Sequence, residues 1–154
     1  DQVAIDAVDP GAVIAVDIDR VEGIPGVSVV RGDIFSDEAV KMIESLCPRR
    51  IDIVMSDMAP NISGAYSCDH ARSIALVERA RDLAFRLLRH GGIFIAKVFD
   101  GDMLKSLLDT LRSRFSKVHV HKPRASRRGS SEVYIVCKGF SAKPFSAKRH
   151  SSVT

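Results

Sequence analysis

The chain has 154 residues, of which 45% are hydrophobic and 27% charged, as in an ordinary globular domain, and its formal net charge is +4. No apolar run approaches the roughly 18 residues that a membrane span requires, so we expect one domain that does not associate with membranes. The three cysteines lack CxxC spacing and the five histidines lack ligand spacing. This pattern predicts free thiols in a reducing compartment and no metal site.

Positive charge is concentrated in the last third of the sequence. Residues 112–128 contain many lysines and arginines and no acidic residue. A stretch of this kind suits the phosphate backbone of a nucleic acid, and we predict that Arg124, Arg127 and Arg128 contact RNA. An ordinary solvated basic surface explains the same run equally well.

Strand and helix patterns alternate from the first residues onward, which predicts an α/β sheet with parallel strands. Short β-branched runs predict strands at 13–17 and 27–32. Ser36 is a suitable N-cap for a helix that ends at Cys47-Pro48, because a proline disfavours helical backbone in the residue before it. The next strand is predicted at 51–56.

The longest predicted helix runs from Asp69, as its N-cap, to His90, and Gly91-Gly92 is expected to end it. Arginines recur every seven residues on its polar side, and we expect them to form a solvated face. These residues are Arg72, Arg79 and Arg86.

The C-terminal part is predicted to contain a strand at 93–98, a helix over 103–115 and strands at 117–121 and 132–137. Only a loop joins the last two strands, so we expect them to pair antiparallel. The polar segment 141–154 is expected to be a basic, flexible tail.

Three charged residues lie in or beside apolar strand-like runs. Asp57 follows the strand in IDIVMSDMAPN, Lys97 lies inside GIFIAKVFDG, and Glu132 begins the strand in SSEVYIVCKGF. An unpaired buried charge is very costly, so residues of mixed sign in such runs are expected to satisfy one another. We therefore predict that the three converge in an active site.

Two further carboxylates follow the first two predicted strands. Asp17 could accept both hydroxyls of a ribose and Asp33 the exocyclic amine of adenine, because ligands of open α/β sheets bind at the carboxyl ends of the strands. Either residue alone could equally be a turn former. Together, in consecutive units, they favour a nucleoside ligand, although neither G-x-G-x-x-G nor the P-loop motif is present.

Four segments together resemble one known family. They are AVDID…GIPGV…RGDIF (15–35), VMSDMAPNISG (54–64), AKVFDGD (96–102) and KPRASRRGSSEVYIV (122–136). In this order they resemble the FtsJ/RrmJ family of S-adenosylmethionine-dependent rRNA 2′-O-ribose methyltransferases.

The resemblance implies a Lys–Asp–Lys–Glu catalytic set in which Asp57, Lys97 and Glu132 are the second, third and fourth members. It leaves open whether Lys97 is a base or an electrostatic anchor. For the cofactor S-adenosyl-L-methionine it implies that Asp17 and Asp33 contact the ribose and the adenine. It also implies that Ile34 contacts the adenine through its backbone and that Asp57 lies near the transferable methyl group.

The family fold implied is Rossmann-like, with a mostly parallel seven-stranded sheet whose last strand is antiparallel. The family's first lysine, first strand and glycine-rich loop are expected before Asp1, so we expect residues 1–140 to be a methyltransferase domain without its first strand. A missing central strand would expose two internal sheet edges and reduce stability. Full activity is expected to need the upstream elements.

The function implied is methyl transfer to a ribose 2′-hydroxyl, on a uridine of 23S-type rRNA in the large ribosomal subunit. We expect a monomer, cytoplasmic in a bacterium or mitochondrial in a eukaryote. The alternatives are an mRNA-cap or tRNA 2′-O-methyltransferase, a catalytically dead RNA-binding relative, and a nucleotide-binding regulatory domain. A regulatory domain would have no need of Lys97 inside a strand.

Overall fold

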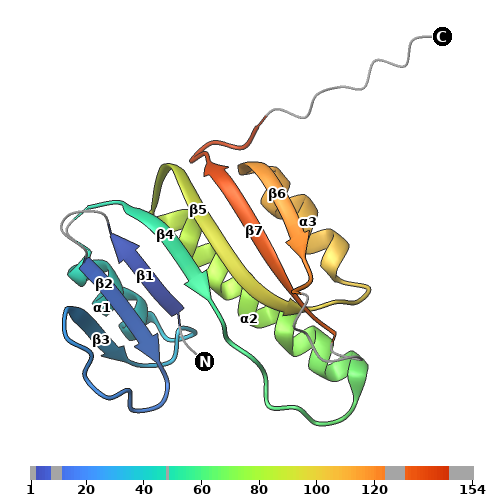
Figure 1. The fold of residues 1–154 in the computed structure, drawn as a ribbon, viewed down its shortest axis with the longest axis horizontal. Helices are drawn as coiled ribbons and strands as arrows, with labels where there is room; N and C mark the ends of the chain where they lie inside the picture. The colour runs from blue at the N-terminus through green and yellow to red at the C-terminus, as the bar shows by residue number, and fades with distance from the viewer. Residues whose placement is uncertain (1–2, 8–11, 48, 124–130, 146–154) are drawn as a thin grey trace.

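The computed structural model describes residues 3–7, 12–47, 49–123 and 131–145. Its strands are β1 (Val3–Ala7), β2 (Ala12–Asp17), β3 (Val27–Arg31), β4 (Ile51–Ser56), β5 (Leu88–Phe99), β6 (Phe115–His121) and β7 (Glu132–Phe140). Its helices are α1 (Asp37–Leu46), α2 (Tyr66–Leu87) and α3 (Leu104–Arg112). The strands form one sheet in the order β3-β2-β1-β4-β5-β7-β6 (Figure 1).

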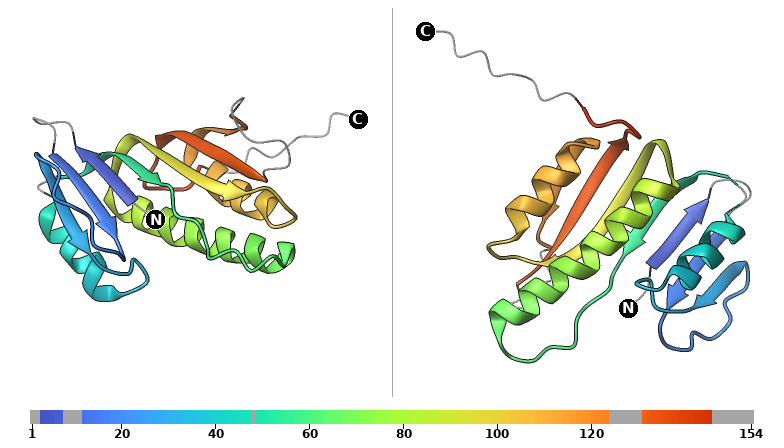
Figure 2. Two further views of the ribbon diagram at one scale, coloured as in Figure 1. Left: turned by 60° about the horizontal axis from the view of Figure 1, so that its bottom comes forward. Right: turned by 180° about the vertical axis from the view of Figure 1, so that it is seen from behind.

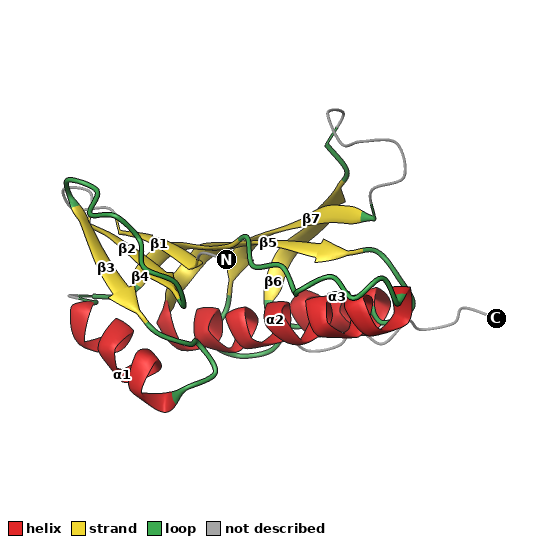
Figure 3. Ribbon diagram, turned by 90° about the horizontal axis from the view of Figure 1, so that it is seen from below, coloured by secondary structure: helices red, strands yellow, loops and turns green. Residues whose placement is uncertain are grey.

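All the described helices lie on the same face of the sheet (Figures 2 and 3). The connections from β3 through α1 to β4, and from β4 through α2 to β5, both advance in the same direction along the sheet. Since such crossovers share one hand, both helices are placed on one face. None of the described helices is long and apolar enough to cross a membrane.

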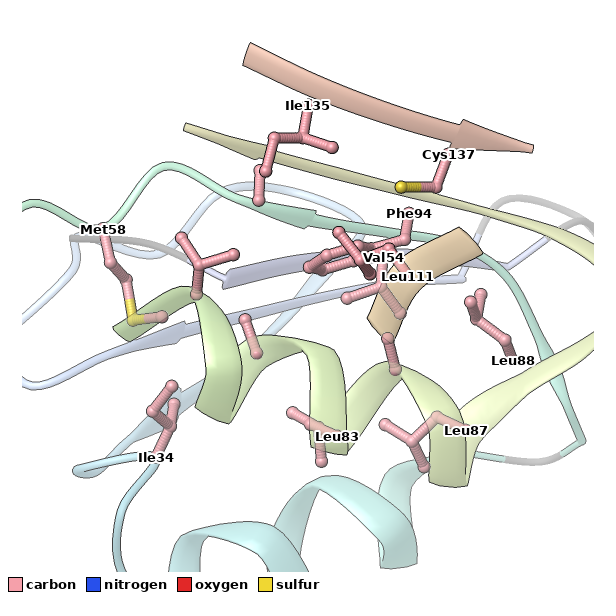
Figure 4. Close-up of a cluster of buried hydrophobic side chains, with 14 of the residues drawn as sticks. Ile34, Val54, Met58, Leu83, Leu87, Leu88, Phe94, Leu111, Ile135 and Cys137 are labelled. Carbon is pink, nitrogen blue, oxygen red and sulfur yellow. The ribbon is translucent and has the colours of Figure 1, made fainter. Parts of the chain in front are cut away.

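The hydrophobic core fills the space between this face and the helices (Figure 4). On β5, Phe94, Ala96 and Val98 are fully buried, whereas the intervening Ile95 and Lys97 are only partly buried. This alternation follows from the two-residue period of a strand. It turns Lys97 away from the helix-covered core.

The centre of the sheet differs from the prediction that the first strand is missing. β1 occupies the place between β2 and β4 and runs antiparallel to both, with Val3 opposite Val16 on one side and Ser56 on the other. An empty place there would leave rows of backbone N–H and C=O groups unpaired, and β1 pairs with both rows. β7 is antiparallel as predicted, and β1 adds a second strand that runs against the others.

The boundary between α2 and β5 was predicted wrongly. The helix ends at Leu87, and β5 begins at Leu88, which pairs with Ile51 of β4. Gly91, with φ of 77°, and Gly92 lie inside the strand, where the pairing with β4 is irregular. A Cβ on Gly92 would lie 2.9 Å from the carbonyl oxygen of Arg89, so this glycine permits a close backbone approach inside the strand rather than ending the helix.

Other boundaries agree more closely. Ser36 caps α1 as predicted, its Oγ accepting from the Ala39 N–H at 3.1 Å. β6 and β7 pair antiparallel, which confirms that prediction. Phe115, predicted at the end of a helix, instead begins β6, and its ring packs against Phe140 at 5.3 Å between centroids.

The described domain continues past residue 140. The Ser141 N–H donates to the Arg114 carbonyl at 2.7 Å, and the Phe145 N–H donates to the Ser113 carbonyl at 2.8 Å. Segment 141–145 therefore belongs to the folded domain, contrary to the predicted start of a tail at Ser141. The rest of that predicted tail, 146–154, lies outside the described residues.

Candidate active site

Asp57, Lys97 and Glu132 come together at one edge of the sheet. The Lys97 ammonium lies 3.1 Å from Asp57 Oδ1 and 3.9 Å from Glu132 Oε1. Neighbouring strands bring them there, because Ser56, just before Asp57, pairs with Ala96, and Glu132 pairs with Phe99. The predicted convergence is confirmed, while the catalytic roles of these residues stay a prediction.

The exposure of the three side chains differs. The Lys97 side chain is 13% exposed, that of Asp57 65% and that of Glu132 44%. The ammonium is thus shielded by the sheet, while the two carboxylates reach solvent. A ligand hydroxyl arriving at this edge would meet a fixed cation held between two acceptors.

A pocket of about 740 Å³ opens beside this cluster, at the carboxyl ends of β2, β3 and β4. The loop from Met58 to Asn61, directly after Asp57, forms one of its walls. The residue that pairs with Lys97, Asp57, is therefore followed directly in the chain by residues that line the pocket. Its remaining lining residues are Val16, Asp17, Ile18, Asp19, Gly32, Asp33, Ile34, Phe35, Arg72, Ala75 and Leu76.

Both predicted carboxylates line this pocket and are oriented by backbone N–H groups. The Asp17 side chain is buried, and its Oδ1 accepts from the Asp19 N–H at 2.9 Å. Asp33 is exposed, and its Oδ1 accepts from the Phe35 N–H at 2.9 Å. These bonds hold each carboxylate at the end of its strand, as the nucleoside prediction requires.

The backbone at Ile34 is held from α2. The Arg79 guanidinium donates from Nε to the Ile34 carbonyl at 2.6 Å. Arg72, about two helical turns earlier on α2, lines the pocket. Arg86 pairs with Glu44 of α1 at 2.6 Å. Arg72 and Arg86 are exposed, as the predicted solvated face requires, whereas Arg79 is partly buried and its bond to the β3–α1 loop was not predicted.

The loop after Asp57 is also tied to α2. Asp69, buried in the first turn, accepts from the N–H and hydroxyl of Ser63 at 2.9 and 2.7 Å and from the Gly64 N–H at 3.1 Å. The bonds from Ser63 hold the pKa of the Asp69 carboxyl below its usual value. Asp69 was predicted to be the N-cap, but the helix already begins at Tyr66. Asp69 lies in the first turn of the helix and hydrogen-bonds to the loop that precedes it.

Sequence reasoning missed the other buried polar side chains of α2. His70 and Ser73 are buried and bond to the backbone of Phe99, the last residue of β5. Their positions could have been noticed, because His70, Ile74 and Val77 share a helical face at spacings of four and three. A polar residue in an apolar stripe needs a buried partner.

Two other predictions from the sequence concern RNA-binding arginines and metal ligands. Arg124, Arg127 and Arg128 lie outside the described residues, so their RNA contacts stay a prediction. Across the described ranges, no group of three or more His, Cys, Asp or Glu side chains is arranged to hold a metal ion.

A family model described as FtsJ-like methyltransferase matches residues 1–140. The chain belongs to this family. It is 42% identical over 134 residues to "Ribosomal RNA large subunit methyltransferase E" of Methanothrix thermoacetophila, covering 87% of this chain and 52% of that protein. It is 45% identical over 141 residues to the protein of the same name from Hahella chejuensis, covering 90% of this chain and 68% of that one.

A crystal structure of a Plasmodium falciparum protein described as a ribosomal RNA methyltransferase superposes with a TM-score of 0.72 at 30% identity. The match covers 82% of this chain and 71% of that one. The FtsJ-like family and its Rossmann-like fold are thereby confirmed. The chain spans about half to two thirds of the length of its curated relatives.

Proposed function

We propose that this FtsJ-like protein transfers a methyl group from S-adenosyl-L-methionine to a ribose 2′-hydroxyl of large-subunit rRNA. The observation that carries the proposal is the Lys97 ammonium, held by Asp57 and Glu132 beside a pocket whose strand ends bear two carboxylates. The names of relatives at 42 and 45% identity support rRNA as the substrate.

The pocket residues fit an adenosine-bearing cofactor. Its volume of about 740 Å³ is in the range of small-molecule sites. Asp17 and Asp33 supply acceptors for ribose hydroxyls and an exocyclic amine, and Ile34, which follows β3, also lines the pocket. S-adenosyl-L-methionine supplies, when bound, an electrophilic methyl group on a positively charged sulfur.

The residues of the chain have to orient the attacking hydroxyl and accommodate its proton. Holding two reactants in line can be worth roughly 7–11 kcal/mol of the barrier. Lys97 is placed to fix or receive the proton of the 2′-hydroxyl, and Asp57 orients the Lys97 ammonium at 3.1 Å. Glu132 approaches the ammonium from β7 and restricts it to the sheet edge.

The finer details belong to the same proposal. The target is a uridine in the large ribosomal subunit, bound by a monomer with Arg124, Arg127 and Arg128 on its phosphates. The reaction takes place where ribosomes are assembled, in the bacterial cytoplasm or the mitochondrion. The basic run around these arginines supports their proposed contacts with RNA phosphates, because phosphate contacts dominate binding to RNA.

Cofactor binding tests the pocket assignment. Using the protein expressed from its complete gene, we expect Asp33→Ala to weaken binding of S-adenosyl-L-methionine by about 1–3 kcal/mol, the usual cost of stranding a hydrogen-bond partner. That corresponds to roughly 5- to 150-fold in affinity, measurable by calorimetry. Asp109→Ala, an exposed carboxylate on α3, is the control. Unchanged affinity in both Asp17→Ala and Asp33→Ala would refute the assignment.

A further inference from the structure

A buried histidine of α2 binds the end of β5 and the turn that follows it. His70 is 4% exposed, and its Nδ1 lies 3.0 Å from the Phe99 carbonyl oxygen. Its Nε2 lies 3.1 Å from the Met103 nitrogen, whose N–H donates to it. A carbonyl can only accept and an amide can only donate, so the imidazole is neutral and carries its proton on Nδ1.

The surroundings of the ring are shaped to fit it. Ser73 Oγ accepts from the Phe99 N–H at 3.0 Å, so α2 side chains bind both backbone polar groups of Phe99. The Tyr66 ring is stacked on the His70 ring with 6.3 Å between the ring centroids, and the Tyr66 hydroxyl donates to the Asp100 carbonyl. These bonds close the turn between β5 and α3 over the imidazole.

Gly101 lies directly against the ring. A Cβ at this position would lie 2.7 Å from His70 Cε1 and 2.8 Å from both ring nitrogens. Real Cβ contacts essentially never reach such distances. The turn can therefore keep this conformation only with glycine at 101 as long as the imidazole is present.

The bound backbone lies next to the reactive cluster. Phe99 follows Lys97 by two residues on β5 and pairs with Glu132 of β7. The Asp100 N–H donates to the Ser131 carbonyl at 2.7 Å, which extends the pairing of the two strands. Whatever fixes Phe99 therefore fixes the ends of both strands that carry Lys97 and Glu132.

We infer that His70 is a positioning residue for methyl transfer, acting through Phe99 to hold Lys97 and Glu132 in register. It touches neither of them and takes no part in the chemistry. Cofactor binding depends on the pocket at β2, β3 and β4, to which His70 does not contribute a wall. The inference rests on the proposed function, because its consequence is a rate of methyl transfer.

Replacing the imidazole by a ring without hydrogen bonds tests this role. We expect His70→Phe to lower the single-turnover rate of RNA methylation at least tenfold, while the Kd for S-adenosyl-L-methionine stays within about twofold of wild type. His70→Asn, which can still donate to the Phe99 carbonyl, should recover part of the rate. His90→Phe, an exposed histidine near the other end of β5, is the control.

The tautomer gives a readout that a merely space-filling residue would not produce. Nitrogen chemical shifts of the His70 ring should show the neutral form with its proton on Nδ1, and the Met103 amide should shift in His70→Phe. A proton on Nε2, or a His70→Phe variant as fast as an active wild type, would refute the positioning role alone. Absence of methylation in wild type would refute the proposed function, and the positioning role with it.

A double-mutant cycle keeps the test decisive if His70→Phe folds poorly. Gly101→Ala should slow methylation because its Cβ meets the imidazole, and the same change should have little effect in a His70→Ala background. Equal rate factors for Gly101→Ala in both backgrounds would show that the ring and the turn are not coupled, which overturns the inference.

Discussion

Removing the Lys97 ammonium should separate catalysis from stability. Its two carboxylate partners lie at 3.1 and 3.9 Å and are 65% and 44% exposed. Ion pairs open to solvent contribute about 0–1 kcal/mol each, so breaking both in Lys97→Ala should cost little folding free energy beyond the lost packing of the stem. The loss of an acid–base or electrostatic group should instead lower the rate by at least roughly 10²-fold.

The two effects differ enough in size to be distinguished. A factor of 10² corresponds to about 2.7 kcal/mol of activation free energy, since each tenfold is about 1.36 kcal/mol. Single-turnover methylation of RNA measures the rate, calorimetry the cofactor affinity, and urea unfolding the stability. Lys105→Ala is a matched control, because Lys105 is 85% exposed and pairs with Asp109 at 3.0 Å on α3, away from the pocket.

Lys97→Arg separates the two possible roles of the ammonium. A guanidinium keeps the positive charge but does not give up its proton at working pH. If arginine restores the rate, Lys97 is only an anchor. If alanine leaves the methylation rate intact while cofactor binding is unchanged, the mechanism proposed here is wrong.

Two further predictions concern the fold around the site. Hydrogen bonds lower the pKa of Asp69 in the folded state, so its contribution to stability is complete above the unfolded pKa of about 4 and is lost as the pH falls through the folded pKa. Urea unfolding should therefore show that wild type loses more stability than Asp69→Asn between pH 5 and pH 3. Parallel losses in the two proteins would contradict these hydrogen bonds. Burial raises the pKa of the Cys137 thiol to about 12, so at pH 8 a thiol reagent should modify exposed Cys68 readily and Cys137 only on unfolding. Rapid reaction of Cys137 in the native protein would refute its placement in the core.

The sequence alone was enough to predict which residues of the reactive cluster meet. Asp57 follows one strand, Lys97 lies in the next parallel strand, and Glu132 begins a strand that only a loop joins to its predecessor. Parallel strands bring their carboxyl ends to one edge, and a charge in an apolar strand requires a partner nearby. Local chemistry likewise fixed the cap at Ser36, since its hydroxyl reaches an N–H only three residues away.

Only the tertiary structure could decide features that depend on distant partners. Val3–Ala7 forms a central strand because β2 and β4 both offer unpaired edges, and nothing in its five residues specifies that place. β5 begins at Leu88 because Ile51 pairs with it, although the local pattern favours a longer helix. Arg79 and His70 read locally as ordinary helix residues, and their roles arise from carbonyl groups brought against them from 45 and 29 residues away. Local sequence sets the backbone preference of a segment, whereas pairing of buried polar groups is settled only when the chain has packed.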